Sequence, residues 1–131
     1  MKRVLFVCIG NCCRSQIAEG FARAYGSDVM EASSAGLSPT PQVAPETIAT
    51  MAEKGIDISS HFPKPYDPRY ARADLIVNLS GGPLPGPAPA EVRTWKVEDP
   101  FQRSRQVYQR CCQEIENHVM QLILELRRAQ R

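Results

Sequence analysis

Apolar residues occur along the chain both in short continuous runs and in stripes with helical spacing. Residues 4–7 form the first run, which is β-branched and aromatic and is typical of a buried parallel strand. Beyond Ser15 the apolar positions recur every three or four residues, and Gly26 suits the end of such a helix. We therefore predict a strand, a short loop and a helix, with Ser15 or a residue just before it as the helix cap.

A second strand and a second helix are predicted in the next part of the chain. Residues 29–35 form the strand, which ends at Gly36. Pro45 opens the helix, and Gly55 lies beyond its end. The apolar face of this helix is expected to consist of Ile48, Met51 and Ala52.

The last third of the chain contains two more predicted strands and a long helix. The strands are expected at residues 74–79 and 95–97, and the Gly- and Pro-rich residues 81–89 between them exclude regular structure. The helix runs from Gln102 and carries one apolar stripe. The residues of the stripe are Val107, Cys111, Ile115, Val119, Leu122 and Leu126.

The alternation of strand and helix patterns predicts the fold class. We expect a single α/β domain over residues 1–131, with a short central parallel sheet in a three-layer α/β/α arrangement. Ligands of such folds bind beyond the carboxyl ends of the strands. Cys8 lies at that end of the first predicted strand, so the loop that follows it is the candidate ligand site.

Charge and cysteine content narrow the class of protein. The formal net charge of +2 argues against bulk binding to nucleic acid or to an anionic membrane, and neither partner is expected. The apolar run at the N-terminus is too short for a signal peptide. The five cysteines are odd in number and clustered, which is typical of reduced thiols rather than of a secreted disulfide framework. We therefore expect a cytoplasmic monomer.

The loop after the first strand reads Cys-Ile-Gly-Asn-Cys-Cys-Arg-Ser over residues 8–15. The N–H groups of such a loop can turn inward beside the positive end of the following helix, and a tetrahedral oxyanion suits that cradle. Arg14 adds a planar bidentate donor, and the same positive field favours the thiolate of Cys8, a nucleophile. The predicted phosphate-binding residues are Ile9, Gly10, Asn11, Cys12, Cys13, Arg14 and Ser15.

Supporting roles follow from the residue types in this loop. Ser15 could donate its hydroxyl to the Cys8 thiolate, and Gly10 allows a close backbone approach or a positive φ. Asn11 tolerates a left-handed conformation. Its amide could tie the loop to a neighbouring element, and Ser34, at the end of the adjacent predicted strand, is the candidate partner.

Two other interpretations fit the same residues. Cys8 could be a buried strand cysteine and Arg14 a solvated helix residue, because a bare C-x5-R match is common. The strand before the match, the helix after it and the Arg-Ser pair favour the catalytic interpretation. The clustered cysteines could also bind zinc, but the paired C-x2-C spacing and a second ligand cluster are missing. We expect neither a metal nor a cofactor.

Residues 4–15, which read Val-Leu-Phe-Val-Cys-Ile-Gly-Asn-Cys-Cys-Arg-Ser, resemble the signature loop of the low-molecular-weight protein tyrosine phosphatase family. Residues 16–20, Gln-Ile-Ala-Glu-Gly, look more like the thioredoxin-coupled arsenate reductase branch of that family. The resemblance extends from about Arg3 to the start of the last helix. Further similar segments are residues 34–36, 53–59, 73–77 and the Asp-Pro pair at 99–100.

The resemblance implies that Asp99 is a general acid. Such an acid protonates the leaving oxygen of a phosphate ester and then deprotonates the attacking water. On sequence alone, Asp99 could instead cap the last helix with Pro100 at its first position, and Glu98 is a competing acid. Phosphatases of the family often have two tyrosines after this pair, whereas this chain has Phe101 and then a glutamine.

An arsenate reductase of this family would carry two resolving cysteines after the middle strand. Residues 78–85 contain no cysteine, and a serine stands where one would be expected. Cys12, Cys13 or an external thiol would have to substitute. Cys13 matches a loop cysteine of the phosphatases, so a reversible Cys8–Cys13 bridge is a further hypothesis.

The remaining candidate residues are expected to have structural roles. Cys111 belongs to the apolar stripe, and its neighbour Cys112 is expected to be partly exposed. His61 and His118 lack a nearby acid or ligand pattern, and Lys64 is expected to be solvated.

The leading hypothesis is therefore a cysteine-dependent phosphatase that acts on a phosphate ester or phosphoprotein through a cysteinyl-phosphate intermediate. The catalytic residues of this hypothesis are Cys8, Arg14 and Asp99. The alternative is an arsenate reductase that uses Cys8 with a non-standard resolving thiol.

Overall fold

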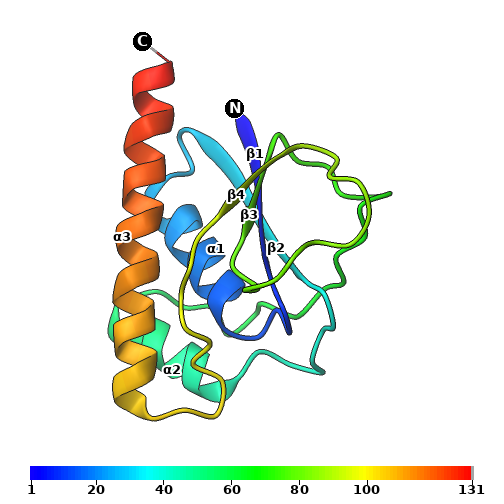
Figure 1. Cartoon of the computed structure of the whole chain (residues 1–131). Helices are drawn as coiled ribbons and strands as arrows, with labels where there is room; N and C mark the ends of the chain where they lie inside the picture. The colour runs from blue at the N-terminus through cyan, green and yellow to red at the C-terminus, as the bar shows by residue number, and fades with distance from the viewer. Residues whose placement is uncertain (131) are drawn as a thin grey trace.

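Figure 1 shows the computed structural model of the chain, which describes residues 1–130. One parallel sheet has the strand order β2-β1-β3-β4. The α/β class with a parallel sheet is thereby confirmed. The strands are β1 (Lys2–Cys8), β2 (Met30–Gly36), β3 (Leu75–Asn78) and β4 (Glu91–Thr94). The helices are α1 (Arg14–Tyr25), α2 (Pro45–Glu53) and α3 (Arg105–Ala129).

The two faces of the sheet are covered by different kinds of structure. Val4 and Phe6 of β1 pack in one apolar cluster with residues of all three helices. Leu5 and Val7 point to the opposite face, because side chains alternate along a strand. There they pack against side chains from the irregular segments that precede and follow β3. The sheet therefore has a layer on each face, as predicted, but only one of these layers is helical.

Proline content explains the irregular layer. Proline lacks the backbone N–H that a helix or central strand requires, and it fixes φ. The segments that flank β3 are rich in this residue, and they run over the second face as long loops (Figure 1). The prolines concerned are Pro63, Pro65 and Pro68 before β3 and Pro83, Pro85, Pro87 and Pro89 after it.

The prediction of the last strand was wrong in position. β4 precedes Trp95 instead of beginning there, and its mostly exposed, polar side chains gave no apolar run to detect. Trp95 still donates its backbone N–H to the Asn78 carbonyl at 3.1 Å. Its ring packs against Phe6, with centroids 5.8 Å apart, and stacks on His118 at 4.9 Å. Residues 95–97, for which a strand is predicted, thus follow β4, and Trp95 and Val97 pack in the core.

The long helix carries the predicted stripe, and every residue of the stripe is buried. Cys112 is fully buried as well, so its expected partial exposure was wrong. It lies in the core because α2 packs across α3 at that point and places Met51 against its sulfur. In α2, Met51 is buried as expected, whereas Ala52 is exposed.

Two of the predicted helix starts differ from the structure. Ser15 lies inside α1, whose N-cap is Cys13 with no side-chain capping hydrogen bond. The cap of α3 is Ser104, whose hydroxyl oxygen accepts the Val107 N–H at 3.2 Å. Asp99 lies before that cap and therefore does not begin the helix, which removes the capping alternative for this residue.

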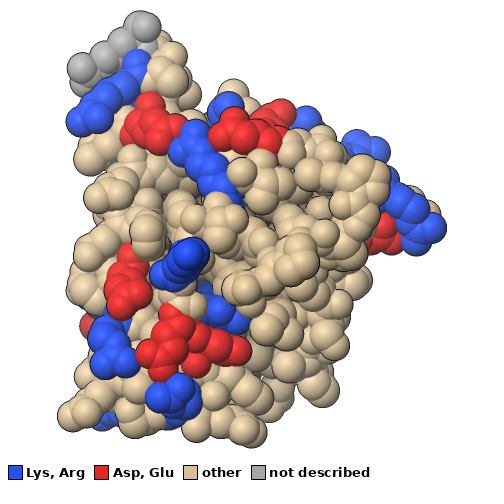
Figure 2. All heavy atoms as spheres, viewed as in Figure 1, with Lys and Arg blue, Asp and Glu red and all other residues tan. Residues whose placement is uncertain are grey.

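The surface shows no dominant charge on the face seen in Figure 2. Lysine and arginine side chains alternate there with aspartate and glutamate side chains. Within residues 1–130, no helix combines the length and the apolar character needed to cross a membrane.

The parallel register places the carboxyl ends of the two central strands side by side. Cys8 pairs with Gly36 of β2, and Val7 pairs with Asn78 of β3. The loops that leave β1 and β3 therefore start next to each other at one edge of the sheet, the edge where ligands of parallel α/β folds bind.

Candidate active site

The loop between β1 and α1 is tightly enclosed by its neighbours. Asn11 has φ +51°, the left-handed conformation predicted for it. Gly10 allows a close approach, because a Cβ there would lie 3.0 Å from Thr40 and 3.1 Å from the Cys12 sulfur. Gly36 is required for a similar reason: a Cβ at this position would lie 2.8 Å from the Asn11 nitrogen and the Ile9 oxygen. The loop therefore folds directly over the end of β2.

A chain of hydrogen bonds leads from Asn11 to the sulfur of Cys8. The Asn11 amide donates to the Ser15 hydroxyl oxygen at 2.7 Å, and Ser15 Oγ lies 2.9 Å from Cys8 Sγ. Because Ser15 accepts from Asn11 through its oxygen, its own proton remains available for the sulfur. All three side chains are buried. Ser15 thus has the position expected for a donor to the thiolate.

The partner expected for Asn11 was wrong. Ser34 donates its hydroxyl to the buried carboxylate of Glu19, and Glu19 pairs with Arg23 at 2.7 Å. The Asn11 side-chain oxygen instead accepts the backbone N–H of Lys64 at 2.9 Å and the Gln16 amide at 3.2 Å. Ser34 is therefore bound to α1 through Glu19 and not to the loop through Asn11.

Arg14 is buried, with 4% of its surface exposed, and its guanidinium is only partly paired. Nη1 donates to the Val97 carbonyl at 3.1 Å, and Nη2 lies 3.5 Å from a carboxylate oxygen of Asp99. Nε is buried without a hydrogen-bond partner among the described residues. Nε and Nη2 form one edge of the guanidinium, and an edge of this kind can donate two parallel hydrogen bonds to an oxyanion.

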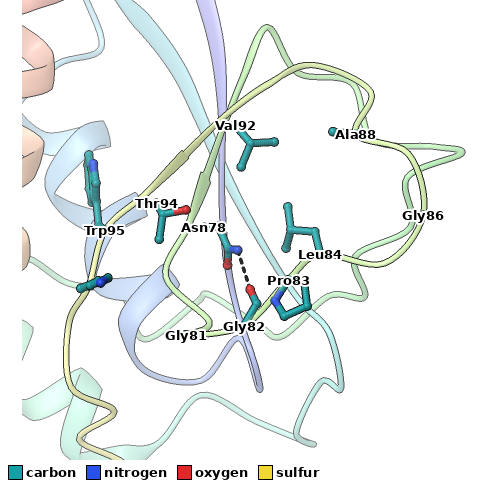
Figure 3. Close-up of a pocket in the computed structure, with 11 residues that line it drawn as sticks. Asn78, Gly81, Gly82, Pro83, Leu84, Gly86, Ala88, Val92, Thr94 and Trp95 are labelled. Carbon is teal, nitrogen blue, oxygen red and sulfur yellow. Dashed lines mark hydrogen bonds between the residues drawn. The ribbon is translucent and has the colours of Figure 1, made fainter.

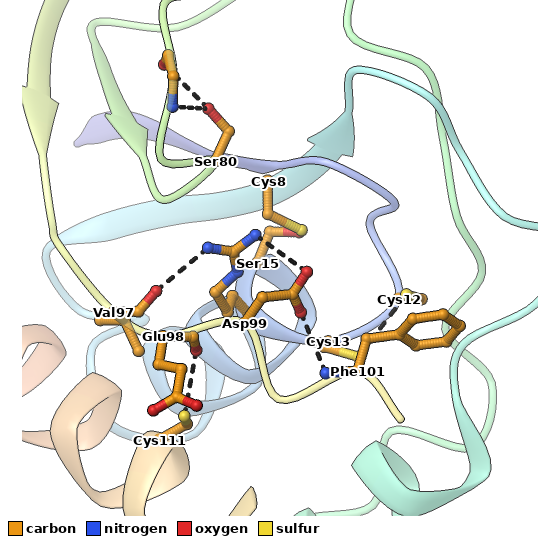
Figure 4. A network of polar contacts seen from close by, with 12 residues as sticks. Cys8, Cys12, Cys13, Ser15, Ser80, Val97, Glu98, Asp99, Phe101 and Cys111 are labelled. Atoms are coloured by element: carbon orange, nitrogen blue, oxygen red, sulfur yellow. Dashed lines mark hydrogen bonds and ion pairs between the residues drawn. The ribbon is translucent and has the colours of Figure 1, made fainter. Parts of the chain in front are cut away.

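Cys8, Arg14 and Asp99 line one cavity of about 160 Å³ together with the loop. Figure 4 shows Cys8 and Asp99 among the polar contacts of this region. A water molecule occupies about 30 Å³ in the liquid, so this volume suits a tetrahedral oxyanion with a few waters. Asp99 comes from the segment between β4 and α3 and also accepts the Phe101 N–H at 3.1 Å. Phe101 lines the same cavity and is 44% exposed, so its ring forms part of the rim.

The other two loop cysteines contact each other. Their sulfurs lie 3.6 Å apart, and the Cys13 sulfur also lies 3.3 Å from the Tyr108 hydroxyl. The hydrogen bond with Cys13 lowers the pKa of Cys12, whereas the same contact and burial raise the pKa of Cys13. Within residues 1–130, no comparable contact joins Cys8 to Cys13. The close pair is therefore Cys12 and Cys13, and the proposed Cys8–Cys13 bridge stays a hypothesis.

Several of the other candidate residues lie away from the cavity. Glu98 pairs with Arg103 at 2.8 Å and with an arginine of α3, so the competing acid faces solvent and not the loop. His61 contacts the Gln16 side chain at 3.0 Å, and burial lowers the pKa of this imidazole. The Lys64 ammonium donates to the Phe62 carbonyl at 2.8 Å and does not line the cavity.

Sequence reasoning missed three residues that hold or line the loop. Gln16 is fully buried and connects Asn11 to His61. Thr40 lines the cavity, and Tyr108 contacts Cys13 from α3. No local pattern marks these residues, because the contacts of Gln16 with His61 and of Tyr108 with Cys13 join positions that lie far apart in the chain.

The loop after β3 has a hydrogen-bond network but no thiol. Ser80 is buried and donates to the Asn78 side-chain oxygen at 2.7 Å, while the Asn78 amide donates to the Gly82 carbonyl at 2.8 Å. Beside this loop lies a cavity of about 500 Å³, bounded by the loop and by β4 (Figure 3). Its lining has no thiol, carboxylate or imidazole, so its larger volume does not make it the better catalytic candidate.

A metal site is not supported by the arrangement of side chains. Across residues 1–130, no group of three or more His, Cys, Asp or Glu side chains is placed to hold a metal ion. The two loop cysteines that contact each other lack such a third ligand, which argues against the zinc interpretation.

Comparisons with known proteins agree on one family. Residues 3–84 match the model described as low molecular weight phosphotyrosine protein phosphatase. The chain is 36% identical over 131 residues to the glutaredoxin arsenate reductase of Synechocystis sp., covering 96% of this chain and 99% of that protein. It is also 37% identical over 119 residues to an arsenate reductase of Staphylococcus aureus, covering 87% and 90% of the two chains.

Solved structures show the same similarity. An arsenate reductase in the phosphate binding state has a TM-score of 0.85 and 34% identity, with 96% of this chain and 99% of that chain covered. The YwlE arginine phosphatase from Geobacillus stearothermophilus has a TM-score of 0.86, with 99% and 96% covered. At 21% identity, the second likeness is one of fold alone.

Proposed function

Since the chain belongs to the low molecular weight phosphotyrosine protein phosphatase family, we propose that this enzyme hydrolyses phosphate monoesters through a cysteinyl-phosphate intermediate. One observation carries the proposal: Cys8, Arg14 and Asp99 line a single cavity of oxyanion size. These are the nucleophile, the charge clamp and the acid that the reaction requires.

The first step transfers the phosphoryl group to Cys8. The thiolate attacks phosphorus, the S–P bond forms and the bond to the leaving oxygen breaks. The Nε–Nη2 edge of Arg14 and the loop N–H groups stabilise the charge on the phosphoryl oxygens. Asp99 donates its proton to the leaving oxygen, so that the leaving group departs as an alcohol or phenol.

The second step regenerates the enzyme. The Asp99 carboxylate takes a proton from a water molecule, which attacks phosphorus while the S–P bond breaks. Ser15 lies 2.9 Å from the departing sulfur and donates a hydrogen bond to it. Inorganic phosphate and the Cys8 thiolate result, and no oxidant or reductant is consumed.

The loop after β3 supports hydrolysis over reduction. Reduction of arsenate needs a second thiol to accept the bond from Cys8, and the five cysteines of the chain place none in residues 79–90. Ser80, at the start of that segment, is buried in the network with Asn78 and Gly82. This segment therefore contains no resolving thiol. A thiol placed at Ser80 would also be buried.

Arsenate reduction is the second candidate, because Cys12 lines the same cavity as Cys8 and the matched relatives are arsenate reductases. In that reaction Cys8 would form a thiol–arsenate adduct. Attack of Cys12 or an external thiolate on the Cys8 sulfur would form a disulfide and pass two electrons to arsenic, releasing arsenite.

A paired assay separates the two activities. Phosphate release from an aryl phosphate and arsenite release from arsenate are measured on the same preparation, with thioredoxin and then with glutathione and glutaredoxin as reductant. We expect phosphate release, with arsenate acting as a competitive inhibitor and little arsenite formed. Arsenite formation at the rate of phosphatase turnover would overturn this assignment, and its loss in Cys12→Ser would identify the resolving thiol.

A further inference from the structure

The chain contains two pairs of adjacent cysteines, and only one of them forms a pair of adjacent thiols. Cys111 and Cys112 are consecutive in α3, where neighbouring side chains diverge. Accordingly, the Cys111 thiol donates to the Glu98 carbonyl, while Cys112 contacts the Met51 sulfur. The backbone of Cys13, the N-cap of α1, is neither helical nor extended, and its sulfur lies 3.6 Å from that of Cys12.

We propose that the Cys12–Cys13 pair is a binding site for trivalent arsenic, held as a dithiolate chelate on the wall of the active-site cavity. The proposal concerns binding, so it goes beyond the proposed hydrolysis and does not depend on it. The same site would take other small thiophilic species that prefer two sulfur ligands.

The spacing of the two sulfurs fits such a chelate. Trivalent arsenic is pyramidal, so bonds of about 2.3 Å to sulfur and an S–As–S angle of about 100° hold the two sulfurs about 3.5 Å apart. The observed separation is 3.6 Å, so the pair closes on one atom with little movement. Residues 1–130 place no third His, Cys, Asp or Glu side chain to bind at this pair. Two thiolates alone suit an ion that completes its coordination with hydroxide or water.

Access to the pair is provided by the cavity itself. Cys12 and Cys13 both line the 160 Å³ space, and Cys12 lies in Figure 4 beside the ring of Phe101 at its rim. Trihydroxyarsenic is a small neutral solute of the size that this space admits. The pair belonging to α3 does not line this cavity.

The binding reaction balances without an oxidant or a reductant. Two thiols replace two hydroxyl groups of trihydroxyarsenic, two As–S bonds form, and two molecules of water leave with the thiol protons. Arsenic stays trivalent, and both sulfurs keep their oxidation state. The chelate then occupies the space that a phosphoryl group would enter, so we expect phosphate and arsenite to exclude each other.

The test measures arsenic binding in a chain that cannot turn over. Cys8→Ser protein is titrated with arsenite, and bound arsenic is counted after gel filtration. We expect one arsenic atom per chain, with two sulfur neighbours in the arsenic K-edge absorption spectrum. Adding Cys12→Ser or Cys13→Ser should weaken binding by about 100-fold or more, because the chelate is lost. Inorganic phosphate should raise the apparent Kd.

The other cysteine pair supplies the matched control. Cys8→Ser protein that also carries Cys111→Ala and Cys112→Ala should keep its arsenic. Circular dichroism checks that each variant folds, and Cys12→Ala provides a second truncation if the serine form does not. Loss of binding in Cys8→Ser alone, or retention when Cys12 and Cys13 are both replaced, would sink the proposal. Neither result depends on phosphatase turnover, so failure here is distinct from failure of the proposed hydrolysis.

Discussion

The loops that leave the two central strands begin side by side at the same edge of the sheet, yet they differ in what they hold together. The loop after β1 is buried under its neighbours and gathers a thiol, a guanidinium and a carboxylate around one cavity. The loop after β3 is exposed over most of its length, and within residues 1–130 its side-chain hydrogen bonds join only Asn78, Ser80 and Gly82.

One asparagine organises each loop, Asn11 in the first and Asn78 in the second. The hydrogen-bond partners of the two side chains explain why only the first loop is fixed relative to the rest of the protein. Asn11 reaches Ser15 of α1 and Lys64 of a distant segment, so it fixes the loop relative to the rest of the protein. Among the described residues, the Asn78 side chain binds only residues two and four positions ahead, so it shapes its own turn. Position at the carboxyl edge is therefore not sufficient for a site; the loop must also be held by contacts from outside itself.

The largest expected effect comes from removing the nucleophile of the first loop. Cys8→Ser should lower turnover of an aryl phosphate by about four orders of magnitude or more, because a serine hydroxyl is a poor nucleophile at neutral pH. Steady-state kinetics measure the loss, and an unchanged melting temperature shows that the fold survives. Turnover comparable to that of the unmodified protein would mean that the chemistry lies elsewhere.

Replacing the guanidinium should have the next largest effect. Arg14→Lys keeps the positive charge but loses the planar fork, so we expect kcat to fall by about 100- to 1,000-fold. Affinity for inorganic phosphate, measured as competitive inhibition, should weaken in parallel. An enzyme with ordinary kinetics after this substitution would show that the loop does not clamp an oxyanion.

Asp99→Asn tests the general acid through its dependence on the leaving group. Phenols of high pKa need protonation as they leave, so kcat/KM for their phosphates should fall by about 100-fold, and by much less for an activated nitrophenyl ester. A leaving-group series provides the measurement. Equal losses across the series would give Asp99 a structural role, for example through its contact with the Phe101 N–H.

A matched pair of asparagine variants compares the two loops directly. Asn11→Gly keeps the left-handed backbone but removes the contacts to Ser15 and Lys64, and turnover should fall by about 10- to 100-fold. Asn78→Ala should lower the free energy of unfolding by about 1–3 kcal/mol, because the Ser80 hydroxyl and the Gly82 carbonyl lose their hydrogen-bond partner. Its turnover should change by less than about threefold. Kinetics and urea denaturation measure both, and a reversed pattern would contradict the assignment of the site.

The smallest expected effect is that of a chelator. EDTA should leave phosphatase turnover unchanged, since the charge clamp of the proposed mechanism is Arg14 and the loop N–H groups. Turnover is measured after dialysis against EDTA and again after zinc is added. Activity that disappears and then returns with zinc would restore the interpretation of the clustered cysteines as a metal site.

Much of the fold could be read from local pattern. The strands around residues 4–7 and 74–79 were detectable because both faces of their central residues are buried, which makes them continuous apolar runs. The strand predicted at residues 29–35 is only partly buried and contains polar residues, so its signal was weaker. β4 was misplaced because it is an edge strand with exposed, polar side chains. The irregular cover of the second sheet face was not foreseen, since a loop that packs on a sheet leaves no periodic signal.

The candidate site could also be predicted in part from the sequence. Residues 8–15 are contiguous, so the order of Cys8, Arg14 and Ser15 between a strand and a helix already contains most of the cradle. Asp99 came from the family resemblance alone, and the structure places it 3.5 Å from Arg14.

What the sequence determined by itself is the local chemistry: a thiol, an arginine and a hydroxyl in one strand–loop–helix unit, where backbone geometry and spacing fix their order. Only the tertiary structure decided which distant groups complete the site. In the folded chain, the Asn11 side chain accepts the backbone N–H of Lys64, and the Ser34 hydroxyl donates to Glu19. It also brought the sulfurs of Cys12 and Cys13 together. Such contacts depend on how the elements pack in three dimensions, and side-chain direction at a helix cap cannot be read from the order of residues.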